Sequence, residues 1–256
     1  MSEPAQRRRV YVIGGSRGIG AACVRAIAEA DFDITFTSRE PMGPVRGVAA
    51  DIRAAQPQAD FRIEELDVSK RDQLERMAAM IEGDEQAFGL VYVAGQSYDM
   101  LVAGVDLDRA IDLMQVNFFG FMRLAGAAMR PMVSARRGRI IAMGSVTALY
   151  GTSGNASYAA TKGAMLGYVR TLAVEVGRKG VTVNYVAPGF VNTDLVAPYA
   201  PHLDRMQKQI PAGRLADPAE VADLVAFLVS PSAAYINGAM LTIDGGLSAS
   251  LISRRG

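Results

Sequence analysis

Short runs of apolar residues alternate along the chain with longer segments whose apolar positions recur every three or four residues. Runs of about four to eight residues rich in Val, Ile and aromatic side chains are typical of strands, and the longer segments are typical of helices. The runs that predict strands are Val10–Ile13, Asp33–Thr37, Phe61–Leu66, Leu90–Val93, Arg139–Met143, Val181–Val186 and Met240–Ile243. The segments that predict helices include Ala21–Ala30, Gln73–Ile81, Leu107–Val133 and Ala156–Val176.

The alternation of strands and helices predicts an α/β fold with a parallel sheet. Several of the strands are apolar with little alternation, which is expected when helices cover both faces of the sheet. We therefore expect a doubly wound Rossmann fold with about seven strands and helices on both faces. No linker, repeat or low-complexity segment divides the chain, so residues 1–256 are expected to form a single domain.

One long stretch lacks regular spacing. It runs from Pro188 to about Leu215, is interrupted by Pro198, Pro201 and Pro211, and has room for a short helix. Long connections at the carboxyl ends of strands are where ligands bind in this architecture. Residues 190–215 are therefore expected to form a substrate lid.

Composition narrows the function classes. Half of the residues are hydrophobic, 21% are charged and the formal net charge is +1, so neither disorder nor nucleic-acid binding is indicated. No apolar stretch is long enough for a signal peptide or a membrane span, which predicts a cytoplasmic protein without membrane association. The single cysteine, Cys23, lies on an expected helix face, and no metal site is expected.

A glycine-rich segment, residues 14–20, joins the first predicted strand to the first predicted helix. This arrangement places backbone N–H groups and the positive end of a helix against a pyrophosphate. Its spacing, Gly-x3-Gly-x-Gly, differs from the common dinucleotide fingerprint, so a simple tight turn is the alternative. The position after the first strand favours a dinucleotide site. The cofactor contacts expected in this loop are Gly14, Ser16, Arg17, Gly18, Ile19 and Gly20.

The end of the second strand indicates which nicotinamide cofactor is bound. An acidic residue at this place binds the ribose 2′-hydroxyl of NAD, whereas this chain has Ser38 and Arg39. Arg39 and Arg17 could clamp a 2′-phosphate, because guanidinium groups match phosphate oxygens in charge and geometry. NADP is therefore expected, and NAD stays open because Glu40 is close by.

Three polar residues in the second half of the chain are candidates for catalysis. Tyr158 and Lys162 share one face of a predicted helix, and the lysine is expected to lower the pKa of the tyrosine from about 10 and so make it a general acid. Ser145 follows an apolar strand and could polarise the same carbonyl oxygen as Tyr158. The alternatives are a chance Tyr-x3-Lys pair and a serine that only caps a turn. Their order after the glycine loop favours catalysis.

With these residues in place, the sequence resembles the short-chain dehydrogenase/reductase family from Val10 to about Leu247. The motifs that carry the resemblance are the glycine loop, Leu66-Asp67-Val68, Asn117, Ser145, Tyr158-x3-Lys162 and Pro188-Gly189-Phe190-Val191-Asn192-Thr193.

The resemblance implies further roles at the site. The additional cofactor contacts that it implies are Asp67, Val68, Ala94, Gly95, Pro188, Gly189, Val191 and Thr193, together with Tyr158 and Lys162. Among these, Asp67 and Val68 would contact adenine, and residues 188–193 would hold the nicotinamide carboxamide. Asn117 would anchor a water chain that passes protons to Lys162. A buried amide bonded to the backbone is the alternative for Asn117, and both can hold.

Within the family, the chain looks most like the bacterial 3-oxoacyl-[acyl-carrier-protein] reductases, through Val183–Phe190, Pro211–Leu215 and Tyr235–Gly238. This implies NADPH-dependent reduction of a 3-oxoacyl thioester, bound to an acyl carrier protein, in fatty-acid or secondary-metabolite biosynthesis. In such enzymes basic residues beside the active site receive the carrier protein. The matching positions here are Arg136, with Arg137 adjacent, and Lys179, for which plain exposed charges are the alternative.

The family also implies a homotetramer. Small residues along Ala156–Leu172 would let two such helices pack closely across a symmetry axis. The apolar stretch Leu247–Ile252 is a second candidate for an interface.

Some positions depart from the family pattern. Tyr92-Val93 replaces an Asn-Asn pair, and Ile13 stands where a threonine is usual, so the hydrogen bonding around the central strands must be rearranged. Gln96, Ser97 and Tyr98, which follow, would line the substrate cleft. These departures keep two alternatives open: an enzyme that acts on a free alcohol or ketone, and a non-catalytic NADP-binding subunit.

Overall fold

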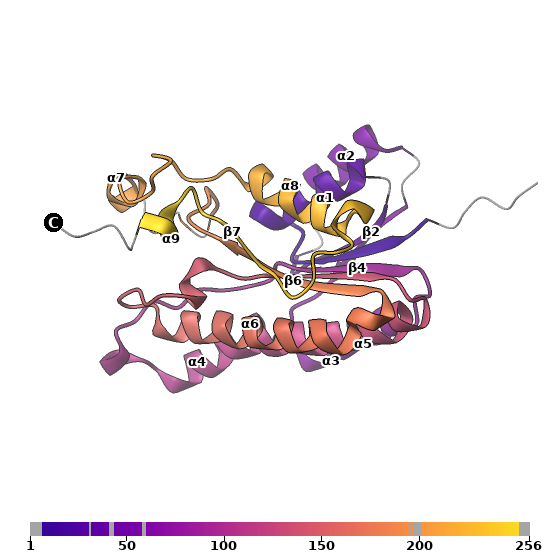
Figure 1. The fold of residues 1–256 in the computed structure, drawn as a ribbon, viewed down its shortest axis with the longest axis horizontal. Helices are drawn as coiled ribbons and strands as arrows, with labels where there is room; N and C mark the ends of the chain where they lie inside the picture. Colours follow the sequence, from indigo (N-terminus) through magenta and orange to yellow (C-terminus); the bar gives the residue numbers. More distant parts are fainter. Residues whose placement is uncertain are drawn as a thin grey trace, which may run out of the picture.

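In the described residues, seven strands form a parallel sheet between two layers of helices (Figure 1). The structure is a computed structural model that describes residues 7–30, 32–40, 44–57, 60–194, 196 and 201–250. The spatial order of the strands is β3-β2-β1-β4-β5-β6-β7. The strands are β1 (Arg9–Ile13), β2 (Asp33–Ser38), β3 (Phe61–Glu65), β4 (Ala87–Tyr92), β5 (Gly138–Met143), β6 (Val181–Pro188) and β7 (Met240–Ile243). The predicted Rossmann fold is confirmed.

The helices divide between the two faces of the sheet, as Figure 1 shows. One face is covered by α1 (Gly18–Glu29), α2 (Pro44–Ala55) and α8 (Pro218–Val229). The other is covered by α3 (Arg71–Glu82), α4 (Leu107–Met114), α5 (Gly120–Ser134) and α6 (Ala156–Val176). The short helices α7 (Leu203–Gln207) and α9 (Leu247–Ser250) follow the carboxyl ends of β6 and β7. Within the described ranges, no helix is both long and apolar enough to cross a membrane.

The sheet separates two buried clusters, because successive side chains of a strand point to opposite faces. In β5, Ile140 and Ala142 belong to the cluster beneath α5 and α6, whereas Ile141 and Met143 belong to the cluster beneath α8. Every residue of β5 is buried. The lack of polar and apolar alternation in this strand therefore has the predicted cause, burial on both faces.

Several elements differ from the predicted boundaries by a few residues, and two of these differences have identifiable local features. Strand β4 begins at Ala87 rather than Leu90, since Ala87 and Gly89 also pair with β1; a Cβ on Gly89 would lie 2.9 Å from the Val10 side chain, so glycine fits this close approach. The predicted helix Leu107–Val133 is interrupted by a π-helical turn at Gln115–Phe119, which separates α4 from α5. A π-turn inserts one residue and keeps the helical spacing on either side of it, so a reading of the spacing alone runs the two helices together.

The order of the strands reverses between β1 and β4, which are neighbours in the sheet. From β1 the chain builds the sheet outward through β2 and β3, and from β4 it builds the other half. In open α/β sheets ligands bind in the crevice outside the carboxyl ends of the strands at this switch point.

The opposite edge of the sheet, at the amino ends of the strands, holds a network of ion pairs. Arg9 is buried, with its guanidinium 3.8 Å from Asp33, 3.1 Å from Asp60 and 3.4 Å from Asp84. The hydroxyl of buried Tyr11 donates a hydrogen bond to Asp84 at 2.7 Å. These contacts join β1 to β2 and to the segments that precede β3 and β4.

Candidate active site

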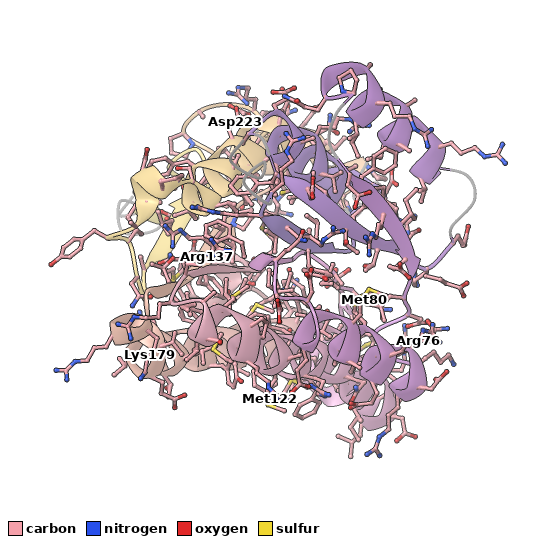
Figure 2. All side chains as sticks on the ribbon, turned by 90° about the vertical axis from the view of Figure 1, so that its right-hand side faces the viewer. Arg76, Met80, Met122, Arg137, Lys179 and Asp223 are labelled. Atoms are coloured by element: carbon pink, nitrogen blue, oxygen red, sulfur yellow. The ribbon has the colours of Figure 1, made fainter. Side chains whose placement is uncertain are left out.

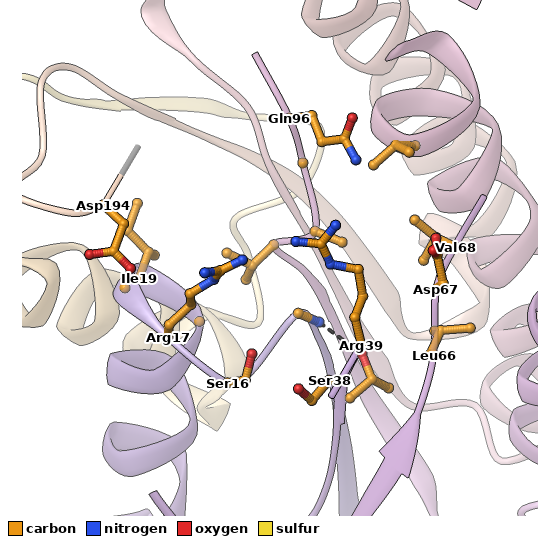
Figure 3. A pocket seen from close by; sticks show the side chains of 18 of the residues that line it. Ser16, Arg17, Ile19, Ser38, Arg39, Leu66, Asp67, Val68, Gln96 and Asp194 are labelled. Atoms are coloured by element: carbon orange, nitrogen blue, oxygen red, sulfur yellow. Dashed lines mark hydrogen bonds between the residues drawn. The ribbon is translucent and has the colours of Figure 1, made fainter. Parts of the chain in front are cut away.

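A cavity of about 580 Å³ opens at the carboxyl ends of β1, β2 and β4 (Figure 3). Most of the residues predicted to bind a cofactor line it: Gly14, Ser16, Arg17, Gly18, Ile19, Gly20, Ser38, Arg39, Asp67, Val68, Ala94, Gly95 and Thr193. Gln96 and Ser97, expected in the substrate cleft, line it as well. The cavity is also lined by Leu66 and Val93, which the sequence analysis named only as parts of motifs, and by Thr37, Val116 and Asp194, which it did not single out.

The glycine loop lies close to the backbone around it. Gly14 has φ +88°, and a Cβ at this position would lie 2.9 Å from the backbone nitrogen of Ala94. A Cβ on Gly20 would collide with the carbonyl oxygen of Gly14. The loop is tied to β2 by Thr37, whose hydroxyl accepts a hydrogen bond from the Gly14 N–H at 2.9 Å. Thr37 thus supplies a polar contact in the region where Ile13 replaces the family's usual threonine.

The start of helix α1 suits an anion. Its N-cap residue, Arg17, makes no side-chain hydrogen bond to the first turn, and no acidic residue lies in that turn. The N–H groups at a helix start and the helix dipole attract negative charge. This helix end and the adjacent loop line the cavity, so the residues fit a pyrophosphate group.

Two arginines approach one another at this end of the cavity. Figure 3 shows the guanidinium groups of Arg17, from the start of α1, and Arg39, from the end of β2, pointing toward each other. Beside them, the Ser38 hydroxyl donates to the backbone carbonyl of Glu40 and accepts from its N–H. Glu40, the acidic residue that kept NAD open, is not among the described residues that line the cavity.

Asp67 lies at the wall formed by β3. Burial acts to raise the pKa of Asp67, but hydrogen bonds from Ser69 and the charges of Arg39 and Lys70 hold it below its usual value. The carboxyl group is therefore ionised at neutral pH and can accept hydrogen bonds.

Part of the segment that follows β6 lies away from this cavity. Pro188, Gly189 and Val191 do not line it; Gly189 donates to the Ile243 carbonyl at 3.0 Å, and Val191 pairs with Ala216. Of the predicted contacts in this segment, only Thr193 lines the cavity. The expected lid contains the short helix α7, and its residues 195 and 197–200 lie outside the described ones.

Ser145, Tyr158 and Lys162 come together where β5 meets α6. The ammonium nitrogen of Lys162 lies 5.5 Å from the centre of the Tyr158 ring and donates to the carbonyl of Met143 at 2.9 Å. Tyr158 and Ser145 are hydrogen-bonded. The Ser145 oxygen also accepts hydrogen bonds from the N–H and the hydroxyl of Thr147, so this serine caps a turn as well.

The expected effect of Lys162 on Tyr158 is wrong for this structure. Burial raises the pKa of Tyr158 to about 12, and its hydrogen bond with Ser145 only partly opposes this rise. Burial also lowers the pKa of Lys162 to about 8. Desolvation disfavours the charged form of both groups, and the Lys162 ammonium is directed to Met143.

Asn117 lies in the π-helical turn, fully buried. Its side-chain oxygen accepts from the Gln96 N–H at 2.8 Å, and its nitrogen donates to the Gln96 carbonyl at 3.0 Å and the Thr161 hydroxyl at 3.1 Å. The interpretation of Asn117 as a buried amide bonded to the backbone is confirmed. A Cβ on Gly95 would lie 3.4 Å from the Asn117 oxygen and 3.6 Å from the Lys162 nitrogen, so these two groups border the same space.

Tyr92, which replaces an asparagine of the family pattern, is fully buried. Its hydroxyl donates to the Val116 carbonyl at 2.5 Å, next to Asn117. A Cβ on Gly120 would lie 2.5 Å from the same hydroxyl. The lost asparagine is thus replaced by a tyrosine that reaches the π-helical turn across a space left by a glycine.

The three basic residues proposed to receive a carrier protein, Arg136, Arg137 and Lys179, lie away from Ser145 within the chain. Arg136 and Arg137 precede β5 and Lys179 precedes β6, so they lie at the amino edge of the sheet, whereas Ser145 follows the carboxyl end of β5. Figure 2 views the molecule from that amino edge, where Arg137 and Lys179 are labelled. All three residues are exposed.

Comparison with known proteins agrees with this site. A family model described as enoyl-(acyl carrier protein) reductase matches residues 13–248. The chain belongs to the short-chain dehydrogenase/reductase family. It is therefore an oxidoreductase of this type, and its cofactor is a nicotinamide dinucleotide.

Two curated members of the family illustrate the similarity. The 3-oxoacyl-[acyl-carrier-protein] reductase FabG of Vibrio cholerae is 37% identical over 250 residues, which cover 92% of this chain and 95% of that protein. The 3-oxoacyl-[acyl-carrier-protein] reductase of Homo sapiens is 35% identical over 237 residues, which cover 92% of this chain and 96% of that one.

Solved short-chain dehydrogenase/reductase structures share the fold. A candidate NAD(P)-dependent gluconate 5-dehydrogenase from Beutenbergia cavernae, solved with bound NADP, superposes with a TM-score of 0.89 at 29% identity over 95% of this chain and 97% of that one. Acetoin dehydrogenase from Enterobacter cloacae gives a TM-score of 0.87 at 25% identity over 96% of this chain and 97% of that one.

Proposed function

We propose that this protein is an NADPH-dependent ketoreductase that reduces a 3-oxoacyl thioester, carried by an acyl carrier protein, to the 3-hydroxyacyl product. The observation that carries the proposal is the cluster of Ser145, Tyr158 and Lys162 at the carboxyl edge of the sheet, beside a cavity that fits a dinucleotide. The curated relatives named above, 35% and 37% identical, are 3-oxoacyl-[acyl-carrier-protein] reductases.

The cofactor is assigned to the cavity on the basis of its charge. The glycine loop and the start of α1 would hold the pyrophosphate, and Arg17 and Arg39 would hold the 2′-phosphate of NADP. Asp67 and Val68 would border the adenine, and Thr193 would border the nicotinamide end. Pro188, Gly189 and Val191 would not contact the cofactor; they would position the segment that carries Thr193.

When bound, the nicotinamide supplies the hydride that reduces the substrate carbonyl. The Tyr158 hydroxyl donates the proton to the carbonyl oxygen; with a pKa raised to about 12, it remains protonated at neutral pH. The Ser145 oxygen already accepts bonds from Thr147, so its own proton is free to be donated to Tyr158 or to the developing alkoxide. The Lys162 ammonium, 5.5 Å from the centre of the Tyr158 ring, would stabilise the negative charge that develops when Tyr158 gives up its proton. Asn117 would anchor a water chain that returns protons toward Lys162.

The cofactor assignment is tested by comparing kcat/KM for NADPH and NADH in the parent and in R17A/R39A. We expect the parent to prefer NADPH and the double variant to lose about tenfold to a hundredfold for NADPH only, because each guanidinium–phosphate contact is charge-assisted. R25A is the matched control, since Arg25 is an exposed arginine of α1 paired with Asp51 at 2.6 Å. A parent that prefers NADH would contradict the assignment.

A free ketone is the second candidate substrate. Gln96 and Ser97 present polar side chains to the cavity and are exposed, which suits a hydroxylated substrate. We expect acetoacetyl-[acyl-carrier-protein] and its short thioester analogue to be reduced with a kcat/KM at least about tenfold above that of free ketones, measured by NADPH absorbance. A higher kcat/KM for acetoin or a sugar ketone would favour the second candidate.

A homotetramer is proposed for the assembled enzyme. The outward face of α6 is open at Gly163 and Gly167, where an added Cβ would meet nothing within 4 Å, and Val174 is 84% exposed on the same helix. These positions would let α6 helices of two copies approach closely. Part of the second candidate, Leu247–Ile252, lies outside the described residues. Sedimentation that shows a monomer would contradict the tetramer.

A further inference from the structure

Tyr185 lies directly beneath the Ser145 segment. It is a fully buried residue of β6, and its hydroxyl accepts a hydrogen bond from the Ser145 N–H at 2.9 Å. The same hydroxyl is 3.2 Å from the Ser145 carbonyl oxygen and 3.3 Å from the Lys162 carbonyl oxygen, to either of which it can donate its proton. One side chain therefore contacts the backbone at two of the residues to which catalytic roles are proposed above.

The ring of Tyr185 reaches this position because residue 144 is glycine. A Cβ on Gly144 would collide with the distal carbons and the hydroxyl of the ring. The Gly144 N–H in turn donates to the Val186 carbonyl at 2.7 Å, which extends the pairing of β5 with β6. Gly144 and Tyr185 thus form a complementary pair across the two strands.

The end of β5 is held at successive polar groups. The Met143 carbonyl accepts from the Lys162 ammonium at 2.9 Å, the Gly144 N–H is bonded to β6, and the Ser145 N–H is bonded to Tyr185. Ser145 itself has an extended backbone, with φ −162° and ψ 153°, and caps the turn that follows. No side chain of that turn supplies the bond to the Ser145 N–H; it comes from the adjacent strand.

We propose that Tyr185 is a positioning residue, whose buried hydroxyl fixes the Ser145 backbone relative to Lys162 on α6. The proposal rests on the catalytic roles proposed for Ser145 and Lys162. A phenylalanine at this position would fill nearly the same volume, but it would leave the Ser145 N–H without its partner and would remove the link to α6. Burial raises the pKa of Tyr185, so the hydroxyl stays protonated and can donate at every working pH.

The test compares Y185F with Y11F. Tyr11 is a matched control, because it is also a buried tyrosine of the same sheet and its hydroxyl also makes a short hydrogen bond, but at the amino edge. For Y185F we expect kcat to fall about tenfold to a hundredfold, since small displacements of reacting groups have effects of this size. The dissociation constant for NADPH is expected to change less than about twofold. The isotope effect on kcat with deuterated NADPH should be at least as large as in the parent, because the step expected to slow is hydride transfer. Y11F is expected to leave these quantities unchanged.

Hydrogen exchange provides a readout that does not depend on turnover. In the parent, the Ser145 amide is expected to be protected, and in Y185F but not Y11F its exchange should accelerate at least about tenfold. Unprotected Ser145 in the parent would overturn the proposal even if Y185F fails to fold. A kcat and an exchange rate in Y185F that match those of Y11F would also overturn it.

The kinetic comparison uses whichever carbonyl compound the parent reduces, so an error in the substrate class leaves it intact. A parent that reduces none of the compounds refutes the proposed function alone, and the exchange measurement then decides the role of Tyr185.

Discussion

The two edges of the sheet each bury a cation and a tyrosine hydroxyl, but they treat the cation differently. At the amino edge, Arg9 has three carboxylates within 4 Å. At the carboxyl edge, Lys162 is 3% exposed, and its ammonium donates to a neutral carbonyl, that of Met143. The carboxylates balance the charge of Arg9, whereas the Met143 carbonyl leaves the charge of Lys162 able to act on the nearby Tyr158 ring.

This difference separates structure from chemistry. A buried cation surrounded by carboxylates joins chain segments through ion pairs. A buried cation held by a carbonyl is more costly to keep charged, and burial accordingly lowers the pKa of Lys162 to about 8. Perturbed groups of this kind are characteristic of reactive sites, and here the group lies beside Tyr158.

The largest effect is expected from Y158F. The variant keeps the ring near Lys162 but has no proton to donate, so kcat/KM for carbonyl reduction should fall about a thousandfold or more. NADPH binding, measured by titration, should change little. Residual activity above about a tenth of the parent would show that another group donates the proton.

At the opposite edge, R9M should affect stability and not chemistry. Removing this cation takes the guanidinium away from Asp33 and Asp84, whose side chains are only 10% and 19% exposed, so the free energy of unfolding should fall by about 3–5 kcal/mol. R25M removes an exposed pair instead and should cost less than about 1 kcal/mol. Denaturant unfolding measures both. Equal losses would mean that burial does not distinguish the two pairs.

The third prediction concerns pH. Below pH 8 Lys162 is charged, and above this value it loses its proton, because its folded pKa is about 8. The kcat/KM for reduction should therefore be level below about pH 7.5 and fall by about tenfold per unit once Lys162 deprotonates. K162M should show low activity without this descending limb. If the parent stays level up to pH 10, the charge of Lys162 is not needed.

The smallest effect is expected for reversal of the basic residues at the amino edge. Because Arg136, Arg137 and Lys179 lie at the edge away from Ser145, R136E/R137E/K179E should change KM by less than about twofold for carrier-bound and small thioesters alike. A rise confined to the carrier-bound substrate would show that the carrier docks there and delivers its acyl group to the site of another copy.

Local pattern was enough to predict the strand–loop–helix unit around Gly14 and the shared helix face of Tyr158 and Lys162. Both depend on residues that are close in sequence. Arg136 and Lys179 each precede a strand, so strand direction alone places them at the amino edge of the sheet. Their assignment as carrier-protein contacts came from matching positions to a family pattern, which takes no account of strand direction.

Other parts of the site depend on contacts between distant segments. In the sequence, Thr37 looks like an ordinary strand residue, and Tyr92 and Tyr185 look like aromatic core residues. Their roles depend on the fold, which places the Thr37 hydroxyl at the Gly14 N–H, the Tyr92 hydroxyl at the Val116 carbonyl and the Tyr185 hydroxyl at the Ser145 N–H. The direction of the Tyr158 pKa was wrong for the same reason. Burial, which comes from the packing of the whole site, outweighs the neighbouring charge that sequence spacing suggests.

The π-helical turn at Gln115–Phe119 acts as a phase shift in the long helical segment. One extra residue rotates everything after it by about 100° relative to a regular α-helix. Deleting a single residue there would produce a smoother helix, but it would turn Asn117 away from Gln96 and Thr161, or else turn the apolar face of α5 off the sheet. The irregularity therefore allows one helix to satisfy two directional requirements, and engineering that regularises it would have to give up one of them.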